Sequence, residues 1–231
     1  MSHDLFKALP IAALLLGTSA AQAVPFGGVE FPQGAISFAD EAVFYDPAYG
    51  GGAVPSAPHR GTDNALGIPN YAGVNSCPSV ANCAFLSLGA GGRAVLRFTD
   101  NVLTGSGSNA FDLWIFEVGP DVEDTTVELS VNGLTWFSVG LVTGSTRGID
   151  IDAYGFDTSS AFSYVRLTDV LDEGGTSGGT VGADIDAVGA ISTRAASPPG
   201  TVPEPASWAL MIGGFALAGG ALRHKARFSL A

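Results

Sequence analysis

The chain has 231 residues and a formal net charge of −12. Residues 24–194 hold 6 arginines, no lysine and 20 aspartates or glutamates, a formal charge of −14, and such a surface repels nucleic acid and anionic lipid but attracts cations. Many acidic chains are disordered, but this one keeps its Phe, Val, Leu and Ile residues in patterned runs, which favours folding. About 170 residues are enough for one domain with its own core, so we expect a single acidic domain.

The first 23 residues have the three-part pattern of a secretory signal. Lys7 precedes an apolar run over residues 8–17, and the small-residue sequence Ala21-Gln22-Ala23 follows. The run is too short for a permanent membrane span, which requires about 20 residues. We therefore expect export, with cleavage after Ala23.

Residues 24–194 have the pattern of an all-β domain. Short runs rich in Val, Phe, Ile, Trp and Thr alternate with clusters of Gly, Asn, Asp and Ser, and no long 3.6-residue apolar period occurs. The predicted strands cover residues 35–45, 84–88, 93–99, 111–118, 125–131, 134–142, 162–168 and 184–191. Eight strands in a domain of this size indicate a single jelly-roll-like β-sandwich.

In some of these predicted strands, the residue pattern indicates which face is buried. Ala94, Leu96 and Phe98 alternate with Arg93, Val95, Arg97 and Thr99, which predicts one core face and one mostly solvated face. The sequence Asn132-Gly133 lies between two predicted strands, and Asn-Gly favours the positive φ angles of a two-residue type I′ turn. We therefore expect a tight hairpin there.

Cysteine and histidine are scarce in this domain. Cys77 and Cys83 are the only cysteines, and in an exported chain such a pair predicts one disulfide. His59 is the only histidine between residues 24 and 194. Zinc binding and histidine-based catalysis are therefore disfavoured, because zinc requires further ligands.

Calcium is the cofactor that the carboxylates favour. Asp184 and Asp186 stand two apart on a predicted strand, so they share one face, and the glycine-rich segment 174–182 precedes them. Asp63 and Asn64 could supply further oxygens, as could Asp112 and Glu117 at the ends of their predicted strand. Oxygen ligands in a flexible loop suit calcium. The alternative is that these groups are solvated carboxylates on outer strand faces, the commoner situation for acidic residues.

We expect no catalytic residues. Asp112 and Glu117 lie five apart on one strand and so point to opposite faces, which prevents them from flanking a sugar. No nucleophile elbow, phosphate loop or dinucleotide fingerprint occurs.

Sugar binding would use exposed aromatic rings, since apolar sugar faces stack on them. Trp114 and Trp136 are the leading candidates, with Tyr71 and Tyr154 as further ones. A packing role in the core is the commoner use of such side chains, and both interpretations stay open at this point.

The C-terminal end has the order expected of a sorting tail. After a linker at 195–202 comes Pro203-Glu204-Pro205, then an uncharged run over residues 206–222, then a basic end with Arg223, His224, Lys225 and Arg227. As a helix the run would rise about 25 Å, close to the roughly 30 Å of the hydrocarbon layer. The basic end is expected to stay in the cytoplasm, so the chain would be anchored in the membrane by residues 206–222.

Residues 203–231 resemble the PEP-CTERM sorting tail, in which this motif, a Gly/Ala-rich span and a basic end occur in the same order. The resemblance implies recognition by an exosortase-type membrane protease and removal of the span. The protein would be anchored transiently in the inner membrane of a bacterium that makes exopolysaccharide and then reach the cell surface or the medium.

The domain itself resembles exported β-sandwich domains of bacterial cell surfaces, of the galactose-binding or discoidin type. The resemblance rests on residues 63–69, 87–92, 111–117, 127–136 and 183–188. It implies a fold that often holds a structural calcium and sometimes binds sugar, although the fold alone establishes neither activity.

The leading hypothesis is a non-enzymatic surface or extracellular-matrix protein whose acidic β-sandwich binds calcium and polysaccharide. A secreted polysaccharide-active enzyme and a purely structural surface module are the alternatives.

Overall fold

The computed structural model describes residues 24–119, 123–174 and 177–196, together with Ile212 and Phe215. The predicted signal peptide, the Pro203-Glu204-Pro205 motif and nearly all of the predicted span at 206–222 lie outside the described residues. Among the residues that are described, no helix is long and apolar enough to cross a membrane. The chain separates into a unit that ends at Ala195 and a second unit from Ala196, and the following concerns the first.

The described part of this unit consists of short strands and single-turn 3₁₀ helices. The strands are β1 (Val24–Phe26), β2 (Val29–Phe31), β3 (Glu41–Asp46), β4 (Leu86–Ser87), β5 (Arg93–Arg97), β6 (Asn101–Leu103), β7 (Leu113–Val118), β8 (Thr125–Ser130), β9 (Phe137–Val142), β10 (Arg147–Ile149), β11 (Tyr164–Asp169), β12 (Asp184–Ala190) and β13 (Thr193–Ala195). The 3₁₀ helices are η1 (Gly34–Ser37), η2 (Ala57–His59), η3 (Thr62–Ala65), η4 (Val80–Asn82) and η5 (Asp152–Tyr154).

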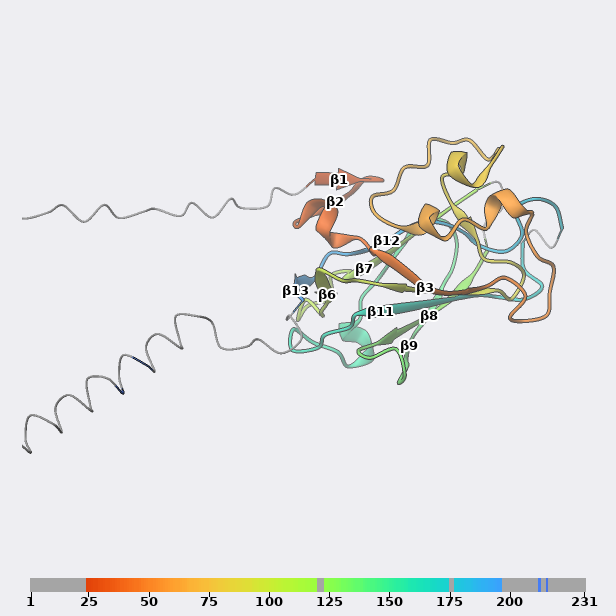
Figure 1. Ribbon diagram of the computed structural model, residues 1–231. Coiled ribbons are helices and arrows are strands. Elements are labelled where there is room, and N and C mark those ends of the chain that lie inside the picture. The colour runs from red at the N-terminus through yellow and green to blue at the C-terminus, as the bar shows by residue number, and fades with distance from the viewer. Residues whose placement is uncertain (1–23, 120–122, 175–176, 197–211, 213–214, 216–231) are drawn as a thin grey trace, which may run out of the picture. The chain divides into compact units, whose positions relative to one another are not determined.

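Two antiparallel sheets form a β-sandwich (Figure 1). One sheet has the strand order β3-β5-β11-β8-β9 and the other has the order β10-β7-β12-β4. The hairpin β1-β2 and the pair β13-β6 are separate two-stranded sheets. The predicted all-β sandwich is confirmed, and each of the eight predicted strands overlaps a strand of the two main sheets. The sequence missed the short strands β1, β2, β6, β10 and β13.

The core lies between the two sheets. On β5, Ala94 and Leu96 are 1% exposed, and they pair across the sheet with Leu167 and Val165 of β11, which are fully buried. The opposite sheet supplies residues such as Ile115, and all belong to one continuous apolar cluster. The predicted alternation on this strand is therefore confirmed, because successive side chains point to opposite faces.

Strand β12 is buried along its whole length, from Asp184 to Ala190. One face belongs to the core, and the other is covered by an aromatic cluster in which Phe31 and Phe38 pack on Phe116 and Ala187. Phe31 belongs to the hairpin β1-β2 and Phe38 follows η1, so the N-terminal part of the domain covers the outer face of this sheet.

Two local predictions were wrong. The strand expected to begin at residue 35 begins at Glu41, because η1 occupies Gly34–Ser37. The hairpin between β8 and β9 exists, but Leu129 pairs with Phe137 and a longer loop replaces the two-residue turn. Among the described residues only Asp172 and glycines have positive φ, so Asn132 does not adopt the type I′ conformation. Its side-chain oxygen instead accepts the backbone N–H groups of Leu134 and Thr135.

Cys77 and Cys83 form the predicted disulfide. Both are buried and pack with Phe85, with the half-buried Tyr71 beside them. The pair lies near His59 in an arrangement that could hold a metal ion, but sulfurs bonded to each other cannot act as thiolate ligands. The disulfide therefore has a structural role, and closing so short a loop stabilises the fold by about 2 kcal/mol.

Candidate functional site

An open groove lies on the outer face of the five-stranded sheet. Its volume is about 380 Å³, and its lining includes Tyr49, Val95, Trp136, Tyr164 and the loop glycine Gly133. Its walls are completed by Val43, Phe44, Arg93 and Arg166. We refer to this feature as the aromatic groove. The sheet register builds it, because Val95 lies opposite Arg166, and Arg93 lies opposite Thr168.

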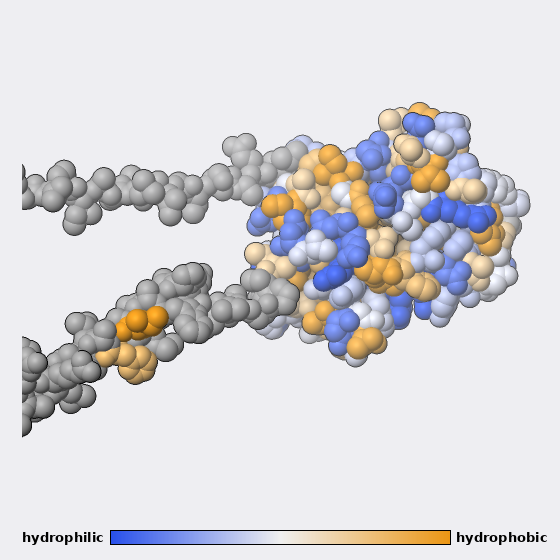
Figure 2. Space-filling model, viewed as in Figure 1, coloured by the Kyte–Doolittle hydropathy of each residue, from blue (hydrophilic) through white to orange (hydrophobic). Residues whose placement is uncertain are grey.

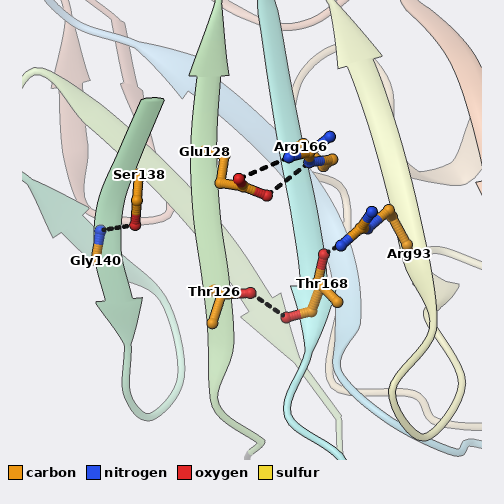
Figure 3. A network of polar contacts seen from close by, with 7 residues as sticks. All are labelled: Arg93, Thr126, Glu128, Ser138, Gly140, Arg166 and Thr168. Carbon is orange, nitrogen blue, oxygen red and sulfur yellow. Dashed lines mark hydrogen bonds and ion pairs between the residues drawn. The ribbon is translucent and has the colours of Figure 1, made fainter. Parts of the chain in front are cut away.

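Polar contacts fix the arginines of the aromatic groove (Figure 3). Arg166 makes two hydrogen bonds of 2.6 Å to the two carboxylate oxygens of Glu128 on the neighbouring strand. The Nε of Arg93 donates to the hydroxyl of Thr168 at 2.9 Å. A bidentate guanidinium–carboxylate pair defines the position of both partners, so the polar groups of the groove are held in place before any ligand arrives.

The arginines also stack on the aromatic rings. The guanidinium carbon of Arg166 lies 4.1 Å from the ring centre of Trp136, and that of Arg93 lies 3.7 Å from the ring centre of Tyr49. Cation–π contacts of this kind stabilise by about 0.5–1 kcal/mol at exposed sites. Each guanidinium group covers one face of its aromatic ring, and Tyr49 remains 50% exposed.

The structure separates the predicted sugar-binding residues. Trp136 lines the aromatic groove, whereas Trp114 belongs to the other sheet and packs against the N-terminal aromatic cluster. Tyr71 packs beside the disulfide, and Tyr154 lies in η5. Only Trp136 therefore belongs to the groove. Sequence reasoning did not single out Tyr49, Tyr164, Arg93 or Arg166, because the strand register that brings them together is a long-range property. The only local signal was the outward position of Arg93 in its alternating strand.

The predicted calcium residues have separate hydrogen-bond partners. Asp186 accepts the backbone N–H groups of Asn70 and Tyr71 at 3.0 and 3.1 Å, and the buried Asp184 accepts the hydroxyl of Ser87. A β-bulge between Ile185 and Ala187 places Asp186 where the register with β7 shifts.

Burial raises the pKa of Asp186, while the two backbone N–H groups oppose that shift. Asp63 is exposed, and the amide nitrogen of Asn64 donates to the carbonyl of Val80 at 3.1 Å. The observed role of Asp186 is thus to hold the 70–71 segment, and calcium binding by Asp63, Asn64, Asp184 and Asp186 stays a prediction.

A second carboxylate group joins Asp112, just before β7, with Asp150 and Asp152, which follow β10. One oxygen from each of Asp112, Asp150 and Asp152 lies within 4.8 Å of the others. Backbone donors already serve this group: Ile151 donates to Asp112 at 3.0 Å, and Ser106 and Gly107 donate to Asp152. Burial raises the pKa of Asp112, and hydrogen bonds from Ser192, Ile151 and Ser106 oppose this increase. The Oδ1 atom of Asp112 has no hydrogen-bond partner of normal geometry.

A third group is the most deeply buried. Glu117 is the last residue but one of β7, and Asp184 is the first residue of the neighbouring strand β12. Asp169 ends β11, and Glu123 lies shortly before β8. All four side chains are between 2% and 4% exposed. Burial raises the pKa of Glu117 to about 9, and the negative charges of Glu123, Asp184 and Asp169 add to this shift. We refer to these four residues as the buried carboxylate cluster.

No protein-family model matches the chain, and no curated protein matches it either. Among solved structures, it is similar to the C-terminal domain of a chitobiase from Bacteroides fragilis. The identity is 15%, the similarity covers 70% of this chain and 95% of that domain, and the TM-score is 0.34. The likeness is therefore weak.

Proposed function

We propose that the chain is an exported, non-enzymatic protein of the cell surface or extracellular matrix, and that its β-sandwich binds polysaccharide in the aromatic groove. The observation that carries this proposal is the gathering of Tyr49, Trp136 and Tyr164 with two fixed arginines around one open hollow. On the face of the domain that Figure 2 shows, hydrophobic and hydrophilic residues are interspersed.

The chemistry of the aromatic groove suits a sugar chain. The apolar faces of pyranose rings pack on aromatic rings, and guanidinium and hydroxyl groups hydrogen-bond the sugar hydroxyls. Arg93, Arg97 and Arg166 are three of the six arginines in residues 24–194, and all lie on the outer face of this sheet. Arg97 pairs with Glu41 and Arg166 with Glu128, so this face is locally close to neutral although the domain as a whole is acidic, and it repels sugar chains less than the rest of the surface does.

We expect Trp136→Ala to weaken binding to the extracellular polysaccharide of the producing cells by about 10-fold or more, the usual effect of removing a central aromatic contact. Affinity electrophoresis of the full chain on neutral and uronate-rich polysaccharides measures this effect. Leu134→Ala is the matched control, because Leu134 belongs to the same loop, is 83% exposed and lies outside the groove lining. Equal retention of Trp136→Ala and the parent protein would contradict the proposal, and shortening of the polysaccharide on incubation would favour the enzyme alternative.

The sequences of the two terminal segments also support a proposal about where the protein is located. An N-terminal signal directs export, and residues 203–231 act as a PEP-CTERM-type tail for an exosortase-type protease. The uncharged run at 206–222 then holds the protein in the inner membrane until cleavage, because the basic end resists translocation.

Intact mass of the protein from producing cells tests these end assignments. The expected mature species begins at Val24 and lacks the span at 206–222. Replacement of Pro203, Glu204 and Pro205 by alanine should leave an uncleaved species in the membrane, whereas alanine at Ser197 in the linker should not. A mature parent protein that still carries residues 208–231 would show an ordinary membrane anchor instead.

A further inference from the structure

The segment between β3 and β4 brings His59 together with the disulfide of Cys77 and Cys83. One ring nitrogen of His59 and the two sulfurs all lie within 4.8 Å of one another, and all three residues are buried. His59 ends η2, Cys77 lies between η3 and η4, and Cys83 directly follows η4. Three separate parts of this segment therefore meet in one small group, which we refer to as the sulfur-histidine cluster.

His59 has one ring nitrogen in a hydrogen bond and the other without a partner. Its Nδ1 lies 2.8 Å from the hydroxyl oxygen of Ser56, and its Nε2 is buried and has no hydrogen-bond partner among the described residues. When the Nδ1–H donates to Ser56, Nε2 keeps a free lone pair. Histidine ligands of metals usually have this arrangement, in which a hydrogen bond from the other ring nitrogen fixes the tautomer. A buried nitrogen without a partner requires an explanation, and a metal ligand role supplies one.

Contacts other than the S–S bond also hold the sulfur-histidine cluster together. The ring of His59 packs against the ring of Phe85, with 5.7 Å between the ring centres, and Phe85 also packs with both cysteines. The backbone N–H of Cys83 donates to the carbonyl of Val80 at 3.3 Å, and the side-chain amide of Asn64 donates to the same carbonyl at 3.1 Å. Opening the disulfide therefore leaves the two sulfurs and the imidazole near one another.

We infer that the reduced sulfur-histidine cluster is a binding site for one Cu⁺ ion, with the thiolates of Cys77 and Cys83 and the imidazole of His59 as ligands. Thiolate sulfur is a soft donor that selects Cu⁺, and this ion tolerates low coordination numbers. Zinc is less suited, because a structural zinc site requires a fourth protein ligand. Within the described part of the chain, no further His, Cys, Asp or Glu joins the group.

Copper binding and the disulfide exclude each other. A dithiol reductant breaks the S–S bond by giving two electrons and two protons to the sulfurs, and it becomes a disulfide itself. Cu⁺ then displaces the two thiol protons and accepts the lone pair of His59. Residues 72–76 beside Cys77 are exposed, so a reductant reaches the bond by displacing a short surface segment. The disulfide is thus the metal-free form of the cluster, and the inference does not depend on the aromatic groove.

The test uses the full chain, purified in detergent, reduced with a phosphine under nitrogen and desalted, with Cu⁺ supplied as a coloured chelator complex. The reduced protein should withdraw one equivalent of Cu⁺ and develop thiolate-to-copper absorption in the ultraviolet. The oxidised protein contains the same histidines and methionines and should withdraw none. His59→Gln should lower the Cu⁺ affinity of the reduced protein by about 100-fold, because it removes a ligand, and Ser56→Ala by about 10-fold, because the imidazole loses its orienting contact.

Ser76→Ala is the matched control, since Ser76 is exposed beside Cys77, and it should keep the Cu⁺ affinity of the parent. The melting temperature of each oxidised variant shows whether it folds, and Ser56→Ala provides the comparison if His59→Gln does not. The inference fails if the reduced parent takes no Cu⁺ from the chelator, or if the folded variants bind Cu⁺ as tightly as the parent. Binding of Zn²⁺ in place of Cu⁺ would overturn the choice of metal, and equal uptake of Cu⁺ by the oxidised protein would place the ion outside the cluster.

Discussion

In the absence of divalent metal, the free energy of unfolding should fall as the pH rises from about 5 to about 8, by up to about 4 kcal/mol from Glu117 alone. The pKa of Glu117 is raised from 4.5 to about 9, first by burial and then by Glu123, Asp184 and Asp169. The pKa of Asp169 is raised to about 6, mainly by burial. The folded protein thus keeps protons that the unfolded chain has released, and its stability is highest below the unfolded pKa and is lost as the pH approaches 9.

Chemical unfolding of the chelator-treated protein across this pH range measures the effect. Glu117→Gln should flatten the profile, since it removes the group that contributes most. A stability that increases between pH 5 and pH 8 without metal would contradict the assignment of Glu117 as a buried neutral acid.

Local patterns in the sequence predict most of the fold. The alternation of Ala94, Leu96 and Phe98 identifies the core face correctly, because burial of one face imposes a period of two on the strand. Short strands such as β6 and β13 give no such signal, because three residues are too few to establish a period. The hairpin turn was predicted wrongly because the side chain of Asn132 can accept backbone hydrogen bonds, which competes with the type I′ turn.

The residues of the candidate sites were harder to predict from the sequence than the strands were. The aromatic groove joins Arg93 of β5, Arg166 of β11 and Trp136 of the β8–β9 loop, and only the strand pairing brings these together. Glu117 was considered with Asp112 because both flank one strand, yet its structural neighbours are Glu123, Asp169 and Asp184. Composition predicts an acidic surface, but it cannot say which of the 20 acidic residues in the domain are buried together.

We expect Gly89→Ala to destabilise the domain by at least about 4 kcal/mol, or to prevent folding. Gly89 has a φ of +91°, and a Cβ atom there would overlap the carbonyl of Pro47. Two costs therefore add: the left-handed backbone, about 1–2 kcal/mol for a residue with a Cβ, and displacement of the 47–52 segment from the 88–92 segment. The second segment also supplies the Gly91 N–H that Asp169 accepts, so the damage extends to the buried carboxylate cluster.

Gly67→Ala separates the two costs, because Gly67 has a similar φ of +72° but nothing within 4 Å of its Cβ position. This control should lose only the backbone contribution. Chemical unfolding of both variants gives the difference directly, with recovery of folded protein as the measure if Gly89→Ala does not fold. Equal losses in the two variants would mean that the 47–52 segment moves aside at little cost, and the close approach at Gly89 would then be incidental to the stability of the sandwich.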